Sequence, residues 1–128
     1  MKDLRKTIGN SGEQKSCDYL LNHGFSIVER NYRTKDGEID IIAKTGEILV
    51  FVEVKTLPSG NAETLLKELD TRKQKRIIKT SKCFLTKYRQ YSNNYIRYDV
   101  IVIDMPGYPE VYHIENAFSE LLRFLVQK

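Results

Sequence analysis

The sequence predicts a mixed α/β fold, in which one mixed sheet is flanked by helices on both sides. The first observation is the order of the helical and strand-like segments, which is αβββαβ followed by a further strand and helix. The second is the length of 128 residues, which is usual for one domain and lets roughly two thirds of the unfolded surface be buried. We therefore expect residues 1–128 to form a single domain around one sheet.

The first helix is expected at residues 11–23. Ser11 can serve as its N-cap and Gly24 can end it. Its apolar residues recur at the spacing of one helix face, and we expect that face to be buried. Residues 25–33 then read as a first strand because they alternate and include β-branched side chains. The expected buried helix residues are Cys17, Leu20 and Leu21.

Residues 38–44 and 47–55 predict two further strands, joined as a hairpin at residues 45–46. In that register, the numbers of two opposed residues sum to 91, which places Asp40 opposite Phe51. A four-residue loop gives the same register. Because side chains alternate along a strand, one face of this hairpin should be continuously apolar. That face comprises Ile39, Ile41, Ala43, Ile48, Val50, Val52 and Val54.

The remaining segments complete the sheet and its cover. Residues 56–69 read as a loop with a short helical piece, and residues 70–91 as a long helix. Residues 97–104 and 110–114 predict strands, and residues 115–126 a terminal helix. The long helix should bury Ile77, Ile78, Ser81, Phe84, Leu85 and Tyr88, and the terminal helix Phe118, Leu121, Leu122 and Leu125.

Charge is distributed unevenly along the chain. Eight basic residues and no acidic residue lie between Arg72 and Arg89, so a net charge of +4 leaves −4 for the rest of the chain. Such a stripe favours a polyanionic partner, because cations spaced along one element neutralise phosphates and release counterions. The alternative is a solvated helix face. The expected nucleic-acid contacts are Arg72, Lys73, Gln74, Lys75, Arg76 and Lys79.

The composition also limits the cellular setting. The polar start of the chain has no apolar segment typical of a secretory signal, and no apolar run approaches the ~18 residues of a membrane span. The two cysteines, Cys17 and Cys83, lie far apart and lack a metal-ligand spacing. We therefore expect a cytoplasmic protein with no membrane partner, in which the cysteines are small buried hydrophobes.

Two carboxylates and a lysine carry the chemistry of the hairpin. Asp40, Glu53 and Lys55 share one strand face by parity, with Asp40 and Glu53 as diagonal neighbours. Unpaired buried carboxylates are costly, and two of them without His or thiolate neighbours suit Mg²⁺ or Mn²⁺. The Lys55 ammonium can activate water or stabilise a phosphoryl oxygen. The alternative is a charge pair of Glu53 and Lys55 at an exposed strand edge.

Other polar residues are weaker candidates for the site. Glu13 is a third candidate because it lies on the core-facing stripe of the first helix, although a favourable position near the positive helix end is the alternative. Glu38 shares the face of Asp40 but starts its strand, so we expect it to be solvated or to support the site. The isolated His23 and His113 read as structural histidines.

The pattern Gly12-Glu13, then GEID at residues 37–40, then FVEVK at residues 51–55, resembles the YraN family. These are predicted endonucleases similar to archaeal Holliday-junction resolvases in the PD-(D/E)XK superfamily. Asn-Tyr-Arg at residues 31–33 and the basic helix near residues 73–76 extend the resemblance over nearly the whole chain. It implies a restriction-endonuclease-like core.

By the same resemblance, four residues of the chain act at a metal-dependent catalytic site and a polar helical residue lies near it. The resemblance implies that Asp40, Glu53 and Lys55 are catalytic, that Glu13 is the helical acidic residue, and that Lys73 or Gln74 is the helical polar residue. Asp40, Glu53 and Glu13 would hold Mg²⁺ or Mn²⁺. Resolvase-like proteins are often dimers, so a homodimer is one option for assembly.

Three functions remain open from the sequence. The first is a metal-dependent endonuclease that hydrolyses phosphodiester bonds of DNA, including branched or junction DNA. The second is a non-catalytic nucleic-acid-binding module that retains the nuclease fold. The third is an interaction or structural domain with no nucleic-acid partner. Fold alone does not fix the substrate, so the choice depends on the site.

Overall fold

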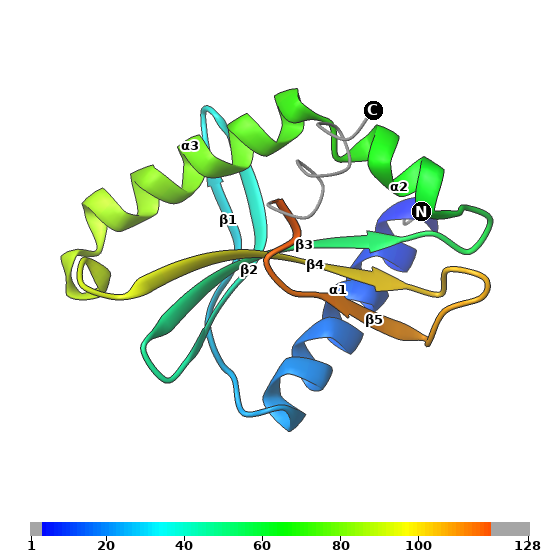
Figure 1. The fold of residues 1–128 in the computed structure, drawn as a ribbon, viewed down its shortest axis with the longest axis horizontal. Coiled ribbons are helices and arrows are strands. Elements are labelled where there is room, and N and C mark those ends of the chain that lie inside the picture. Colours follow the sequence, from blue (N-terminus) through cyan, green and yellow to red (C-terminus); the bar gives the residue numbers. More distant parts are fainter. Residues whose placement is uncertain (1–3, 119–128) are drawn as a thin grey trace.

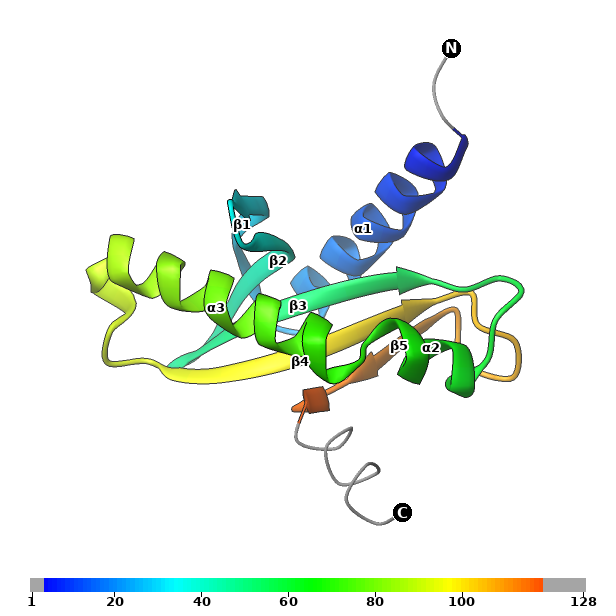
Figure 2. The same ribbon diagram turned by 90° about the horizontal axis from the view of Figure 1, so that it is seen from above.

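The computed structural model describes residues 4–118, and the side chains from residue 11 onward. It has a five-stranded mixed sheet with helices on both faces, which confirms the predicted fold class (Figure 1). Figure 2 shows α1 on one side of the sheet and α2 with α3 on the other. The elements are α1 Leu4–Asn22, β1 Ser26–Thr34, β2 Gly37–Thr45, β3 Ile48–Thr56, α2 Ala62–Glu68, α3 Thr71–Lys87, the 3-10 turn η1 Arg89–Tyr91, β4 Tyr95–Ile103 and β5 Val111–Ile114.

The strands lie in chain order, β1 to β5, across the sheet. Strands β1, β2 and β3 form an antiparallel meander, β4 joins β3 in parallel, and β5 is antiparallel to β4. The parallel pair needs a crossover, because the end of one strand must connect to the distant start of the next. Helices α2 and α3 form that crossover and cover one face of the sheet.

Each face of the sheet has its own apolar cluster. On the α3 side, Phe51 and Phe84 pack edge to face with ring centroids 6.0 Å apart, within a cluster that also includes Ile42 and Leu49. On the α1 side, the buried residues are Cys17, Leu20, Ile41, Ala43, Val50, Val52, Ile101 and Ile103. Cys17 is buried, as predicted, whereas Cys83 on α3 is only partly buried, so the prediction fails for it.

Helix α1 is longer than predicted and buries a narrower stripe. It begins at Leu4, so Ser11 lies inside the helix and is not its N-cap. Gly24 ends it in the left-handed conformation, with φ +84°, as predicted. Leu20 is fully buried, but Leu21 is 55% exposed and does not belong to the buried face. Successive helical residues are about 100° apart, and the contact with the sheet is too narrow to include both.

The β2–β3 hairpin turns one residue later than predicted. Its two-residue turn is Gly46-Glu47, with Thr45 opposite Ile48 and Gly46 at φ +56°. Opposed residues therefore sum to 93 and not 91, as in the pair Ile42 and Phe51. A shift of two residues keeps every side chain on its face, because the strand period is two. The predicted register was wrong, whereas most predicted faces were right.

Ile39 is the exception, because the alternation of faces breaks at Asp40. Ile41 packs on the α1 side as predicted, but Ile39 packs on the α3 side. Strand β1 is irregular at the same level: Arg30 pairs with Ile41 and Tyr32 with Ile39, and the intervening Asn31 has φ +53°. The sheet is therefore distorted on both sides of Asp40.

The α3 face and the chain end follow the predictions with smaller differences. Asp70 caps α3 by accepting a hydrogen bond from Lys73 N, and the helix ends at Lys87, four residues before the predicted end. Ile77, Ser81 and Phe84 are buried, while Ile78, Leu85 and Tyr88 are only partly buried. Phe118 is buried. The rest of the predicted terminal helix, with Leu121, Leu122 and Leu125, lies outside the described residues.

Candidate active site

Acidic and basic side chains from four elements converge around the distorted part of β2. Asp40 comes from β2, Glu53 and Lys55 from β3, Lys73 from the first turn of α3, and Glu13 from α1. They are grouped by their hydrogen bonds, ion pairs and electrostatic effects on one another. The structure thus brings together the residues that the sequence predicted for the site.

At Asp40, a hydrogen bond to the side chain takes the place of a backbone hydrogen bond between β2 and β3. The backbone ladder between β2 and β3 is regular from Thr45 to Ile41, opposite Val52. Beyond it, Asp40 Oδ2 accepts a hydrogen bond of 2.8 Å from Val54 N. Burial raises the pKa of Asp40, the Val54 N–H opposes that rise, and the charge of Glu38 adds to it. One carboxylate oxygen is thus fixed by the backbone of β3, and the other accepts no hydrogen bond from the residues that the structure describes.

Glu53 is the most perturbed acid of the group. It is only 6% exposed, and its Oε1 lies 3.9 Å from Lys55 Nζ and 3.8 Å from Lys73 Nζ. Burial, followed by the charge of Asp40, raises the pKa of Glu53 to about 8, although both lysines oppose the rise. Two ammonium groups at this distance do not fully compensate a buried carboxylate beside a second one. The pair Asp40 and Glu53 therefore favours a proton or a cation between its members.

Lys55 is held between two acids. Its Nζ lies 3.9 Å from Glu53 Oε1 and 3.8 Å from Glu68 Oε2, at the end of α2. The Lys55 side chain is 24% exposed, so the ammonium group faces the rim of the site and not bulk solvent. Sequence patterns did not indicate Glu68, because helix α2 approaches β3 only through the tertiary fold.

Glu13 reaches the group from the opposite side of the sheet. Its side chain is 15% exposed, and Oε2 lies 4.0 Å from Arg30 Nη2. With its amide nitrogen turned toward the acids, Asn31 donates to Glu13 Oε2 and Glu38 Oε1, each at 3.1 Å. Burial, followed by the charge of Asp40, raises the pKa of Glu13. Asn31 thus links Glu13 to Glu38.

Gly12 explains how α1 comes so close. A Cβ at this position would overlap Thr56 Oγ1 at the end of β3. That hydroxyl is buried and has no hydrogen-bond partner in the part of the chain that the structure describes. A glycine thus permits the contact of α1 with β3, and the next residue, Glu13, is placed at the acidic group.

The basic residues of α3 divide between the site and the surface. Lys73 contacts Glu53, whereas Arg72, Lys75, Arg76 and Lys79 are exposed. Lys79 also forms an ion pair of 3.5 Å with Asp36 in the β1–β2 turn. The structure does not place Gln74 with them, because its side chain is 6% exposed and its Nε2 donates to Leu69 O at 2.8 Å. Gln74 thus connects α3 to Leu69, the residue that follows α2.

The donor set suits a hard cation. Among residues 11–118, no three His, Cys, Asp or Glu side chains are arranged to hold a metal ion as they stand. Mg²⁺ does not need such a cage, since it keeps several waters and commonly uses one or two carboxylates together with substrate phosphates. Asp40 and Glu53 fit that requirement, whereas the hydrogen bonds of Asn31 join Glu13 to Glu38 and not to this pair. A cation between the two acids would compete with Lys55 and Lys73 for Glu53.

A second buried charge network lies away from this site, on β4 and β5. Asp99 is fully buried and accepts two hydrogen bonds of 2.9 Å from Arg97, one of 2.9 Å from Asn116 N and one of 2.7 Å shared with His113 Nε2. His113 Nδ1 lies 3.3 Å from the Tyr19 hydroxyl on α1. These contacts tie β4, β5 and α1 together, which agrees with the predicted structural role of His113.

Sequence reasoning missed Asn31 and Glu68 as members of the site. Asn31 has a weak sequence signal, because asparagine tolerates the left-handed conformation better than most residues. No periodicity predicts which side chain such a residue presents. Within residues 4–118, none of the helices combines the length and the apolar character needed to cross a membrane.

Comparisons with known proteins place the chain in a family. The profile of Uncharacterised protein family UPF0102 matches residues 12–103, which include Gly12-Glu13 and all the strands up to the end of β4. A UPF0102 protein of Geobacter metallireducens is 42% identical over 115 residues, which cover 89% of this chain and 93% of the relative.

Two further relatives show the same extent of similarity. A UPF0102 protein of Treponema denticola is 40% identical over 125 residues, covering 89% of this chain and 96% of the relative. One of Clostridium botulinum is 40% identical over 122 residues, covering 93% and 99%. The resemblance to YraN-like proteins is thereby confirmed at the level of the family, and the chain belongs to Uncharacterised protein family UPF0102.

Proposed function

We propose that this protein is a metal-dependent endonuclease that hydrolyses phosphodiester bonds of DNA. The observation that carries the proposal is the buried pair Asp40 and Glu53, with Lys55 beside it. The resemblance of GEID and FVEVK to the PD-(D/E)XK nucleases supports the same assignment. We place the activity in the cytoplasm, in keeping with the free cysteines Cys17 and Cys83.

The electrostatics of the pair support a cation as part of the working state. Asp40 and Glu53 raise the free energy of the ionised site through burial and mutual repulsion. A bound Mg²⁺ or Mn²⁺ would neutralise both acids and polarise a phosphoryl oxygen. Asp40 would offer the oxygen that Val54 N leaves free, and Glu53 its Oε2, which is the atom that neither lysine contacts among the described ion pairs.

Lys55 and Lys73 would then take over different tasks. Both ammonium groups lie within 4 Å of Glu53 Oε1, so a change of charge at Glu53 alters their surroundings directly. Lys55 would orient a water molecule or stabilise negative charge on the phosphoryl group. Glu68, 3.8 Å from the Lys55 ammonium group, would hold it at the site. Lys73 would neutralise a phosphate next to the reacting one.

The test is a cleavage screen with Mg²⁺ and Mn²⁺ over duplex, single-stranded, flap and four-way-junction DNA. We expect Asp40→Asn, Glu53→Gln and Lys55→Ala each to abolish cleavage and leave the fold intact. DNA binding should stay the same or tighten, because the change removes a carboxylate that repels phosphates. The double change Asp40→Asn with Glu53→Gln should be little worse than either alone. Glu47→Gln, in the exposed β2–β3 turn, is the matched control.

The exposed basic residues of α3 are assigned to the DNA backbone. Replacing Lys75, Arg76 and Lys79 by Gln should weaken binding and flatten its dependence on salt, since each lost phosphate contact removes about 0.9 from the log-log slope for duplex DNA. A control with the same change in net charge away from α3 should keep the slope. That control replaces Lys15, Lys44 and Lys67 by Gln, on α1, β2 and α2. Equal slopes for both variants would indicate that the exposed basic residues of α3 form only a solvated helix face.

One observation favours a second function, a nucleic-acid-binding module without catalysis. Glu53 already has two lysines near it, and no three acidic, histidine or cysteine side chains among residues 11–118 form a ready metal site. DNA binding with neither metal binding by calorimetry nor cleavage would support that alternative. If both acid substitutions also raised thermal stability without changing any activity, the enzymatic proposal would be refuted.

A further inference from the structure

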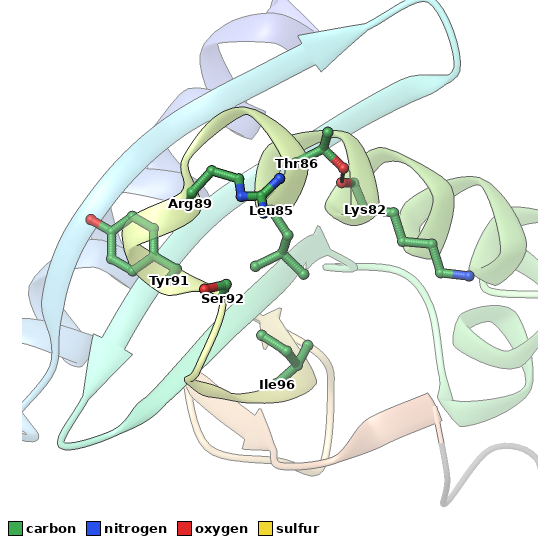
Figure 3. A pocket seen from close by; sticks show the side chains of 7 residues that line it. All are labelled: Lys82, Leu85, Thr86, Arg89, Tyr91, Ser92 and Ile96. Carbon is green, nitrogen blue, oxygen red and sulfur yellow. Dashed lines mark hydrogen bonds between the residues drawn. The ribbon is translucent and has the colours of Figure 1, made fainter.

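A pocket of about 410 Å³ lies at the other end of α3 from the acidic group, where the helix, η1 and the start of β4 meet (Figure 3). Leu85 and Ile96 point toward each other across it. Tyr91 lines one end, and its ring stacks on Phe84 with centroids 5.7 Å apart, so the core holds it in place. The pocket therefore has a rigid apolar floor that includes one aromatic ring.

The rim of this pocket is positively charged. Lys82 and Arg89 line it, together with the hydroxyl-bearing Thr86, and none of its lining residues is acidic. In the sequence, no acidic residue occurs from residue 71 to residue 98. Its size lies within the range of about 300–1,000 Å³ that is usual for small-ligand sites. An apolar floor with a cationic rim suits a ligand that has a flat ring and an anionic group.

The exposed side of α3 connects this pocket with the acidic group. Lys75, Lys79, Lys82 and Thr86 follow one another at intervals of four, three and four residues, so they form one stripe along the helix. Lys73, which contacts Glu53, and Leu85, which lines the pocket, are 12 residues apart in α3. At 1.5 Å per residue, this separation is about 18 Å along the helix. At 3.4 Å per step of a duplex strand, that distance corresponds to about five base pairs.

We propose that this pocket binds an unpaired nucleotide of the DNA substrate, with its base on Tyr91, Leu85 and Ile96 and its phosphate at Lys82 and Arg89. The inference rests on the proposed nuclease function and narrows its substrate class to duplex DNA that continues into a single strand about five base pairs from the acidic group. Stacking on an aromatic ring with a nearby cation is the usual way in which proteins hold unpaired bases.

Binding in the absence of divalent metal tests the pocket independently of cleavage. The probes are a fluorescent blunt duplex and the same duplex with a three-nucleotide extension, in separate 5′ and 3′ versions. We expect the full-length protein to bind at least one extended probe about fivefold or more tightly than the blunt one. Thr86→Phe, which fills the pocket without a change of charge, and Arg89→Gln, which removes a rim charge, should each reduce that preference. Both positions are exposed, so the fold should tolerate both changes.

Lys87→Gln is the matched control, because Lys87 is on the same helix but lies over the Tyr88 ring and does not line the pocket. It should keep the preference. Equal binding of blunt and extended probes, or a preference that survives both pocket variants, would overturn the inference. Cleavage of blunt and extended DNA with equal affinity would leave the nuclease proposal standing without it. A preference abolished by both pocket variants, in a protein that cleaves nothing, would instead support the pocket and refute the nuclease.

Discussion

Glu53 provides a thermodynamic signature of the site that does not depend on finding a substrate. In the metal-free protein its pKa is about 8, against an ordinary value of 4.5 in the unfolded chain. Between these values the native state binds the proton and the unfolded state has lost it. The free energy of unfolding contributed by this group is thus fully present below about pH 4.5 and is lost as the pH rises toward 8.

The expected magnitude follows from the difference between the two pKa values. Each pH unit in this interval lowers the free energy of unfolding by up to about 1.4 kcal/mol. Over the full interval the loss is on the order of 4–5 kcal/mol, a large part of the stability of a small domain. Solvent screening reduces it little, because Glu53 is only 6% exposed. The variant Glu53→Gln has no titrating group at this position and should not show the loss.

Urea unfolding in EDTA, from about pH 5 to about pH 8, measures this difference. Wild type minus Glu53→Gln should fall by about 1 kcal/mol per pH unit or more. Glu47→Gln should run parallel to wild type, and Mg²⁺ should flatten the wild-type curve, because a bound cation displaces the proton. Parallel curves for wild type and Glu53→Gln in EDTA would show that Glu53 is ionised in the native state, and the reasoning from its burial would be refuted.

Two further predictions concern stability. Asp99→Asn should lower the free energy of unfolding by about 3–5 kcal/mol in urea titrations near neutral pH, since it removes the buried partner of Arg97 and leaves the exposed Glu115, 3.9 Å away. Asp104→Asn at an exposed ion pair should cost at most about 1 kcal/mol. Hydrogen bonds lower the pKa of Asp99, so its contribution should be present above about pH 4 and be lost as the pH falls through that lowered value. Gly12→Ala should lower the free energy of unfolding, because the added Cβ overlaps Thr56. Adding Thr56→Ala should restore most of that loss, with a coupling energy of about 1–3 kcal/mol in a double-mutant cycle. Additive effects of the two changes would contradict the close contact.

The fold was largely predictable because its signals are local. Alternation identified the strands of the meander, and the 3.6-residue period of the apolar residues identified α3. The register of the β2–β3 hairpin was not predictable in the same way, because Thr45-Gly46 and Gly46-Glu47 are both chemically acceptable turns. The error was an even number of residues, so the parity that puts Glu53 and Lys55 on one face of β3 was unaffected.

The prediction of the site was limited by irregular backbone and by contacts between distant segments. The position of Ile39 was wrong, because alternation assumes a regular strand and β2 is distorted at Asp40, next to the left-handed Asn31. Glu68 enters the site only because α2 packs beside β3. Such contacts depend on the three-dimensional path of the chain, which neither periodicity nor residue type encodes.

The parallel pairing of β3 with β4 has a consequence for the order in which the site assembles. Strands β1, β2 and β3 are joined by short turns, whereas β3 and β4 must close a loop that contains α2 and α3. Closing longer loops costs more chain entropy, so we expect the meander to form first during folding. Asp40 and Glu53 would then meet before Lys73 reaches them on α3. The two acids would pass through a stage with fewer counterions, and folding should be faster at pH values where Glu53 keeps its proton, or when a divalent cation is present.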